Sequence, residues 1–205
     1  MAERIVAFAG SLRQRSFNRA LIRAAGELAP PGLAIESIEI GGLPLYDADL
    51  EAAGDPAAVA AFKEAIRRAD GLLIATPEHN DGLPGALTNA IDWASRLPGR
   101  SPLIGKPVAI MGASPSQVGT ARAQLHLRQV LAHTQARLLP PPELLVGSAQ
   151  QRFDAELRLV DEATRWIMGD LLRRFEQWIA RERAAREATV REAERTARAG
   201  TAKSA

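Results

Sequence analysis

The sequence predicts an α/β fold in which helices cover both faces of a doubly wound, five-stranded parallel sheet. Apolar strand patterns alternate with segments of helical periodicity, and the connections between them are short. The run at 72–76 shows no polar alternation, which is typical of a strand buried on both faces of a parallel sheet. The 205 residues are 46% hydrophobic and 24% charged, which is enough apolar material for one domain of this class.

Turn residues separate the expected elements, notably Pro and Gly at 29–32 and three prolines at 140–142. Strands are expected where an apolar or alternating run lies between such signals, at 5–9, 33–40, 72–76, 108–113 and, more weakly, around 137–139. Helices are expected where apolar residues recur every three to four positions, after the loop at 10–18, from Pro56 to about Asp70, at 86–97, at 120–133, and from about Asp154 to Ile179. A structured loop is expected at 41–47.

Composition limits the domain organisation and the partners. Residues 1–180 are expected to form the domain, and residues 181–205 an Arg-, Glu- and Ala-rich tail that is a frayed helix or disordered. The chain has no cysteine, which excludes disulfides, thiol nucleophiles and Cys-ligated metal sites. A formal net charge of +2 without one basic face does not indicate a nucleic-acid partner. No apolar run approaches the ~20 residues of a membrane span and no signal-peptide pattern is visible, so a cytoplasmic protein without a membrane partner is expected.

Three polar loops directly follow expected strands, at 10–18, 77–85 and 114–119. Because crossovers between parallel strands are right-handed, all strand-to-helix loops lie along one edge of the sheet. In a strand order of 2-1-3-4-5, the first and third strands flank the point where the order reverses, and a ligand crevice opens at their carboxyl ends. The three loops are therefore expected to build one binding site.

The loop at 10–18 suits a phosphate group. It precedes a helix N-terminus, where unpaired N–H groups and the helix dipole attract anions. Hydroxyl, amide and guanidinium donors for phosphate oxygens are available from Ser11, Arg13, Arg15, Ser16 and Asn18. The alternative is that Ser16 only caps the helix and the arginines are solvated. The loop matches neither the Mg-nucleotide P-loop nor the Gly-x-Gly-x-x-Gly fingerprint.

The loop at 77–85 suits a flat heterocycle attached to that phosphate. Its glycines allow close approach of the backbone, its prolines stiffen the turn, and successive amides can donate to ring atoms. Glu78, His79 and Asp81 could instead form an acid–base cluster or a metal site, but side chains at these positions of a tight loop point in divergent directions. No catalytic side chain and no metal ligand is therefore assigned.

Two long motifs resemble the NADPH-dependent FMN reductase family, which includes chromate- and quinone-reducing flavoproteins. They are Gly-Ser-Leu-Arg-x-x-Ser-x-Asn at 10–18 and Pro-Glu-His-Asn-x-x-x-Pro-Gly-x-Leu-x-Asn-Ala-Ile-Asp-Trp at 77–93, and the blocks at 113–115 and 122–131 resemble it too. The resemblance covers roughly residues 4–175. It implies a flavodoxin-like fold that binds FMN non-covalently, with NADPH or NADH as co-substrate.

By motif position, the resemblance implies that the first loop holds the FMN phosphate, the second lines the ring and the third closes the site. The implied cofactor-binding residues are Ser11, Arg13, Ser16, Phe17, Asn18, Pro77, Glu78, His79, Asn80, Asp81, Gly82, Ser114 and Gly119. The resemblance also implies a ping-pong reduction of quinones, azo compounds, metal oxyanions such as chromate, or free flavin, in a homodimer or homotetramer.

Three positions depart from the family pattern. His79 stands where Tyr is typical, Gly82 where Ser is common and Thr88 where Lys is common, which bears most on substrate and nicotinamide preference. Two other functions stay open, namely a flavodoxin-like electron carrier without direct NAD(P)H oxidation and a flavin-free regulatory domain on the same fold. Arg13 and Arg15 argue against the carrier, because carriers of this kind usually dock through acidic surfaces.

Overall fold

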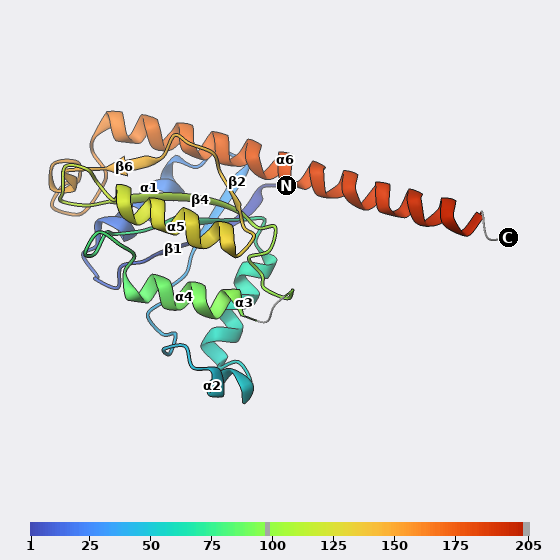
Figure 1. Ribbon diagram of the computed structural model, residues 1–205. Helices are drawn as coiled ribbons and strands as arrows, with labels where there is room; N and C mark the ends of the chain where they lie inside the picture. Colours follow the sequence, from blue (N-terminus) through green and yellow to red (C-terminus); the bar gives the residue numbers. More distant parts are fainter. Residues whose placement is uncertain (97–98, 203–205) are drawn as a thin grey trace.

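A computed structural model describes residues 1–96 and 99–202 as a three-layer α/β sandwich around a parallel sheet (Figure 1). The strand order is β2-β1-β3-β4-β5, and β6 also pairs with β4. The strands span Glu3–Ala9 (β1), Leu33–Ser37 (β2), Gly71–Ala75 (β3), Pro107–Ala113 (β4), Arg137–Leu138 (β5) and Leu144–Val146 (β6). Every residue of β3 and β4 is buried, as their unbroken apolar patterns predict. The predicted flavodoxin-like fold class and strand order are confirmed.

Helices cover both faces of the sheet because successive strand side chains point to opposite sides. Ile5 and Ala7 of β1 pack with α1 (Phe17–Leu28) and α6 (Glu162–Ala202), whereas Val6 and Phe8 face the other helical layer. That layer contains α3 (Ala57–Arg68), α4 (Gly85–Ser95) and α5 (Ala121–His133). The short helices α2 (Ala48–Ala52) and η1 (Ala149–Gln151) are additions to the prediction. The expected helix end at residue 97 lies outside the described residues.

The fifth position of the sheet is shared by two short strands rather than one. β5 pairs with Pro107 and Val108 at the start of β4, and β6 pairs with Met111–Ala113 at its end. The three prolines at 140–142 lie between them, and proline has no N–H to donate to a ladder. The weak strand expected around 137–139 is therefore observed as β5, and the chain rejoins the sheet as β6.

The expected helix start at Asp154 is wrong, because α6 begins only at Glu162. The carboxylate of Asp161 accepts hydrogen bonds from the Thr164 N–H (2.9 Å) and hydroxyl (2.6 Å), which is N-cap geometry. From Glu162, α6 continues to Ala202 and extends past the sheet (Figure 1). The division into a domain at 1–180 and a tail at 181–205 stays a prediction. Within the described ranges, no helix combines the length and apolar character that a membrane span requires.

Candidate functional site

The loops that follow β1, β3 and β4 meet at the carboxyl edge of the sheet and enclose a cavity of about 230 Å³. Most of the residues predicted for the site lie around it. The cavity is lined by Ser11, Arg13, Ser16, Phe17, Asn18, Pro77, Glu78, His79, Ala113, Ser114 and Pro115. Of these, Ala113 and Pro115 are additions to the prediction. Asn80, Asp81, Gly82 and Gly119 do not line the cavity.

The first loop presents a helix N-terminus to this cavity. Ser16 is the N-cap of α1, and its buried side chain accepts a hydrogen bond from the Asn18 N–H at 3.2 Å. No acidic residue stands in the first turn of α1, so its positive end is not compensated from within the helix. The guanidinium of Arg13 bonds to the Arg15 carbonyl at 3.0 Å, and its exposed side chain lines the cavity. This combination of donors fits an anion.

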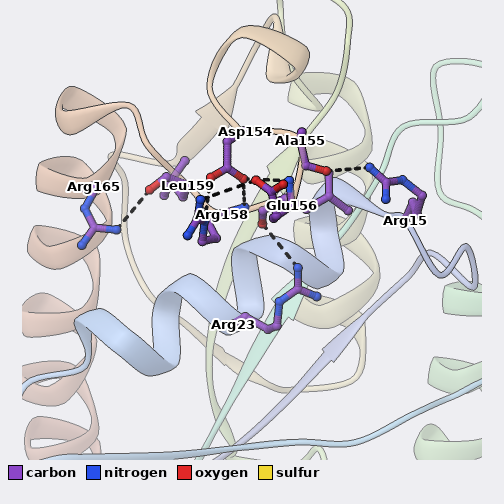
Figure 2. A network of polar contacts seen from close by, with 9 residues as sticks. Arg15, Arg23, Asp154, Ala155, Glu156, Arg158, Leu159 and Arg165 are labelled. Atoms are coloured by element: carbon purple, nitrogen blue, oxygen red, sulfur yellow. Dashed lines mark hydrogen bonds and ion pairs between the residues drawn. The ribbon is translucent and has the colours of Figure 1, made fainter.

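Arg15 does not line the cavity. Its guanidinium donates to the carbonyl of Ala155 at 2.8 Å, in the loop that precedes α6 (Figure 2). Arg23 and Arg165 donate to the carbonyls of Leu157 (3.3 Å) and Leu159 (3.1 Å) in the same loop. Three arginines thus hold that loop by its backbone. Of the two arginines in the loop at 10–18, Arg13 is the one that lines the cavity.

Asn18 also has a structural partner. Its side-chain amide donates to the Ala113 carbonyl at 2.9 Å, and its amide oxygen accepts from the Ala113 N–H at 2.9 Å. Only 3% of Asn18 is exposed. The residue therefore ties α1 to the end of β4, which places the first and third loops side by side.

The second loop contains a tight hairpin at residues 79–82. His79 and Gly82 exchange backbone hydrogen bonds at 3.1 and 2.9 Å, and Asn80 and Asp81 between them have φ of 49° and 60°. Positive φ at both central positions defines a type I′ turn, which Asn and Asp tolerate better than other non-glycine residues. The hairpin presents Asn80 and Asp81 to solvent at its tip.

Glu78 anchors the hairpin to α5. One carboxylate oxygen accepts the backbone N–H groups of Arg122 (2.9 Å) and Ala123 (3.0 Å) at the helix N-terminus. The Arg122 guanidinium in turn pairs with Asp81 at 2.9 Å. The charge of Glu78 is thus directed at a helix dipole, where it stabilises the helix start. Its spacing of 44 residues from Arg122 explains why sequence patterns missed the contact.

Two glycines allow close packing around the site. A Cβ on Gly10 would lie 3.0 Å from the Pro84 ring and 3.1 Å from Leu87, so the first loop packs against the start of α4. Gly119 has φ of +66°, and a Cβ there would lie 3.2 Å from the carbonyl carbon of Leu145. Gly119 is therefore required by backbone conformation and by contact with β6, and it supports the third loop from behind.

Asn89 and Trp93 of the second motif hold the loop at 41–47 onto α4. Both donate to the Pro44 carbonyl at 2.8 Å, and the Asn89 side-chain oxygen accepts from the Tyr46 N–H at 2.7 Å. Trp93 is fully buried, as its helical face predicts. The roles of these two residues became visible only with the fold, although their i, i+4 spacing marks one helix face.

Comparisons with known proteins show the family to which the chain belongs. A family model described as NADPH-dependent FMN reductase matches residues 3–151. The chain belongs to this family. The NAD(P)H-dependent FMN reductase of Pseudomonas aeruginosa is 48% identical over 178 residues, which cover 87% of this chain and 96% of that protein. The Escherichia coli K12 quinone reductase is 42% identical over 180 residues, 86% of this chain and 95% of that protein.

A solved structure extends the comparison to three dimensions. FerB, a flavoenzyme NAD(P)H:(acceptor) oxidoreductase from Paracoccus denitrificans, superposes with a TM-score of 0.82 at 34% identity and covers 88% of this chain and 99% of that chain. As an NADPH-dependent FMN reductase family member, the protein is an oxidoreductase that uses FMN and NAD(P)H. The site fits FMN, because Arg13, two serine hydroxyls and the α1 N-terminus surround one cavity with the donors that a phosphate needs.

Proposed function

We propose that the protein oxidises NADPH or NADH and reduces quinones, with azo compounds, metal oxyanions such as chromate, and free flavin as further acceptors. Quinones come first because several relatives are named quinone reductases, and one from Burkholderia sp., 44% identical, is named 2-hydroxy-1,4-benzoquinone reductase. The single observation that supports the proposal most is the cavity between the cationic first loop and the rigid 79–82 hairpin.

In this proposal, the chain's own residues bind and orient the cofactor. Ser11, Arg13, Ser16 and the first amides of α1 hold the FMN phosphate, while Phe17 and Asn18 shape that end of the cavity. Pro77, Glu78 and His79 line the ring, the turn at 80–82 fixes the backbone of His79, and Ser114, supported by Gly119, closes the third side. When bound, FMN would supply the redox chemistry, as hydride acceptor for NAD(P)H and as electron donor for the second substrate.

The protein needs no general acid or base for this reaction. Glu78, the carboxylate that lines the cavity, accepts two backbone N–H groups of α5, and His79 is exposed at the rim. We expect NAD(P)H and the acceptor to use the same open side of the site in turn, which gives ping-pong kinetics. In this proposal the protein is a homodimer or homotetramer and acts in the cytoplasm, where NAD(P)H is available.

Arg13→Ala tests the phosphate site, with Arg15→Ala as the matched control. Loss of charge-assisted hydrogen bonds worth about 1.5–3 kcal/mol should weaken FMN binding about 10- to 150-fold in Arg13→Ala. Because the Arg15 guanidinium bonds to Ala155, its removal should change FMN affinity less than about threefold. Both constants come from titrating FMN into apo-protein and following flavin fluorescence. Equal affinities of the two variants would contradict the assignment.

The redox proposal is tested with the FMN-loaded protein. Rapid mixing with NADPH or NADH should bleach the flavin absorbance directly, and a steady-state panel of a quinone, an azo dye, chromate and free FMN ranks the acceptors. Parallel lines in double-reciprocal plots are expected for the ping-pong scheme. A flavin that stays oxidised in the presence of both nicotinamides would instead identify an electron carrier that needs a separate reductase.

A further inference from the structure

A strongly basic pocket lies at the amino edge of the sheet, opposite the FMN site. Its volume is about 190 Å³, and it lies where Asp70 and Pro107 lead into β3 and β4. Among the residues that line it, one is acidic, Asp70, whereas five are cationic: Arg67, Arg68, Lys106, Arg183 and Arg186. Such a surplus of positive charge in a concave surface favours an anion.

Three of these cations have carboxylate partners. Arg67 and Arg68 share Glu64, at 3.4 and 2.6 Å. Arg183 pairs with Glu3 and lies 3.6 Å from Asp70. These contacts hold the three guanidinium groups in place around the pocket. The two acidic partners of Arg183 offset its charge, whereas Arg67 and Arg68 share one carboxylate.

Lys106 and Arg186 are different, because their bonds go to backbone carbonyls. The Lys106 ammonium donates to the carbonyl of Ala69 and, at 3.4 Å, to that of Arg67, while Arg186 donates to the Gly105 carbonyl at 3.0 Å. Within residues 1–96 and 99–202, neither makes an ion pair. Carbonyl oxygens fix the two side chains but do not neutralise them.

The two cations also repel each other. Burial and, to a smaller extent, the charge of Arg186 lower the pKa of Lys106 to about 8, and Asp70 opposes this shift only in part. Arg183, Arg67 and Arg68 line the same pocket. A group with two negative charges would relieve this repulsion and satisfy the remaining donors.

We propose that Lys106 and Arg186 form a second anion site, for a phosphate-type dianion, where α6 passes the amino edge of the sheet. The dianion is inorganic phosphate or the phosphate group of a small metabolite. The site is separate from the FMN site, because the two lie at opposite ends of the strands. Arg186 lies on α6, beyond residues 3–151, which match the family model.

The test uses FMN-loaded protein, so that the FMN phosphate site is occupied. Calorimetric titrations at pH 8 and constant ionic strength compare sulfate, inorganic phosphate and phenyl phosphate, with chloride as the background anion. We expect saturable binding of the dianions, and a preference for phosphate or for phenyl phosphate identifies the free anion or an ester as the ligand class. Sulfate itself does not take up a proton at this pH. Proton uptake by the protein when sulfate binds, up to about half a proton per site, therefore reports the protonation of Lys106.

Variants assign the site to its residues. Arg186→Gln should weaken dianion binding about tenfold or more, whereas Arg191→Gln should change it less than about twofold. Arg191 is the matched control, because it lies on the same helix but pairs with Glu187 at 3.7 Å and does not line the pocket. Lys106→Gln should abolish the proton uptake. Absence of saturable dianion binding, or equal effects of Arg186→Gln and Arg191→Gln, would overturn the proposal.

Discussion

Replacing Asn18 with leucine should destabilise the apo-protein more than it weakens FMN binding. β3 ends at Ala75, opposite Met111, so two residues later the N–H and C=O of Ala113 have no strand partner on that side. The Asn18 amide replaces the missing strand with two hydrogen bonds of 2.9 Å. Ala113 and Asn18 are each 3% exposed, so water cannot take over these bonds without rearrangement.

The expected loss follows from those two backbone groups. A buried polar group left without a partner lowers the free energy of unfolding by about 1–3 kcal/mol. Loss of both bonds to Ala113 should therefore lower it by about 2–6 kcal/mol, out of a total of about 5–15 kcal/mol. Urea denaturation of the apo-protein, followed by circular dichroism, should show a midpoint lowered by about 1–3 M at an unchanged slope. Asn18→Asp keeps the acceptor for the Ala113 N–H and should fall between the wild type and Asn18→Leu.

FMN affinity decides between two roles for Asn18. If Asn18 acts only by bonding to Ala113, the FMN affinity of Asn18→Leu should fall only to the extent that the first and third loops become less ordered. An unchanged urea midpoint together with FMN binding weakened more than about tenfold would refute this reasoning. It would show instead that Asn18 contacts the phosphate directly, as the motif resemblance implies.

Further predictions concern the packing and the caps. Gly112→Ala should lower the free energy of unfolding by about 1–3 kcal/mol or more, because the added Cβ would overlap Thr120 and the Thr76 carbonyl. Gly26→Ala in α1 should raise the free energy of unfolding by about 0.5–1 kcal/mol, because no atom lies within 4 Å of the new Cβ. Thermal unfolding of the two variants tests both expectations. Asp161→Ala should lower the free energy of unfolding at pH 7 by about 0.5–2 kcal/mol, because the substitution removes the N-terminal cap of α6. Hydrogen bonds from Thr164 and Arg152 lower the pKa of Asp161 to about 2, so this stabilisation is complete above about pH 4 and lost as the pH falls through 2. Urea midpoints of wild type and variant should therefore converge over that range, and a constant difference down to pH 2 would contradict the assigned pKa.

The arginine network around the loop before α6 shows how a motif divides its roles. Arg13 and Arg15 are equivalent as possible phosphate donors in the loop composition, because they lie two residues apart in one cationic loop. In the folded chain, one lines the cavity and the other bonds to Ala155, 140 residues away (Figure 2). The family motif specifies Arg13 and leaves the position of Arg15 open, but the contact of Arg15 could not be predicted, because its partner lies in a loop that was expected to be helical.

The sequence by itself predicted the parallel sheet, the helical layers and the meeting of three loops at one edge, and the family resemblance implied the strand order 2-1-3-4-5. The features that need no resemblance depend on periodicity, which is local, and on the right-handed crossovers of parallel sheets. Only the tertiary structure decided that Asn18 serves Ala113, that Glu78 caps α5, and that Lys106 meets Arg186 of α6 at the opposite edge. Each of these contacts joins residues that are far apart in sequence, and a polar side chain finds such a partner only after packing has removed water from around it.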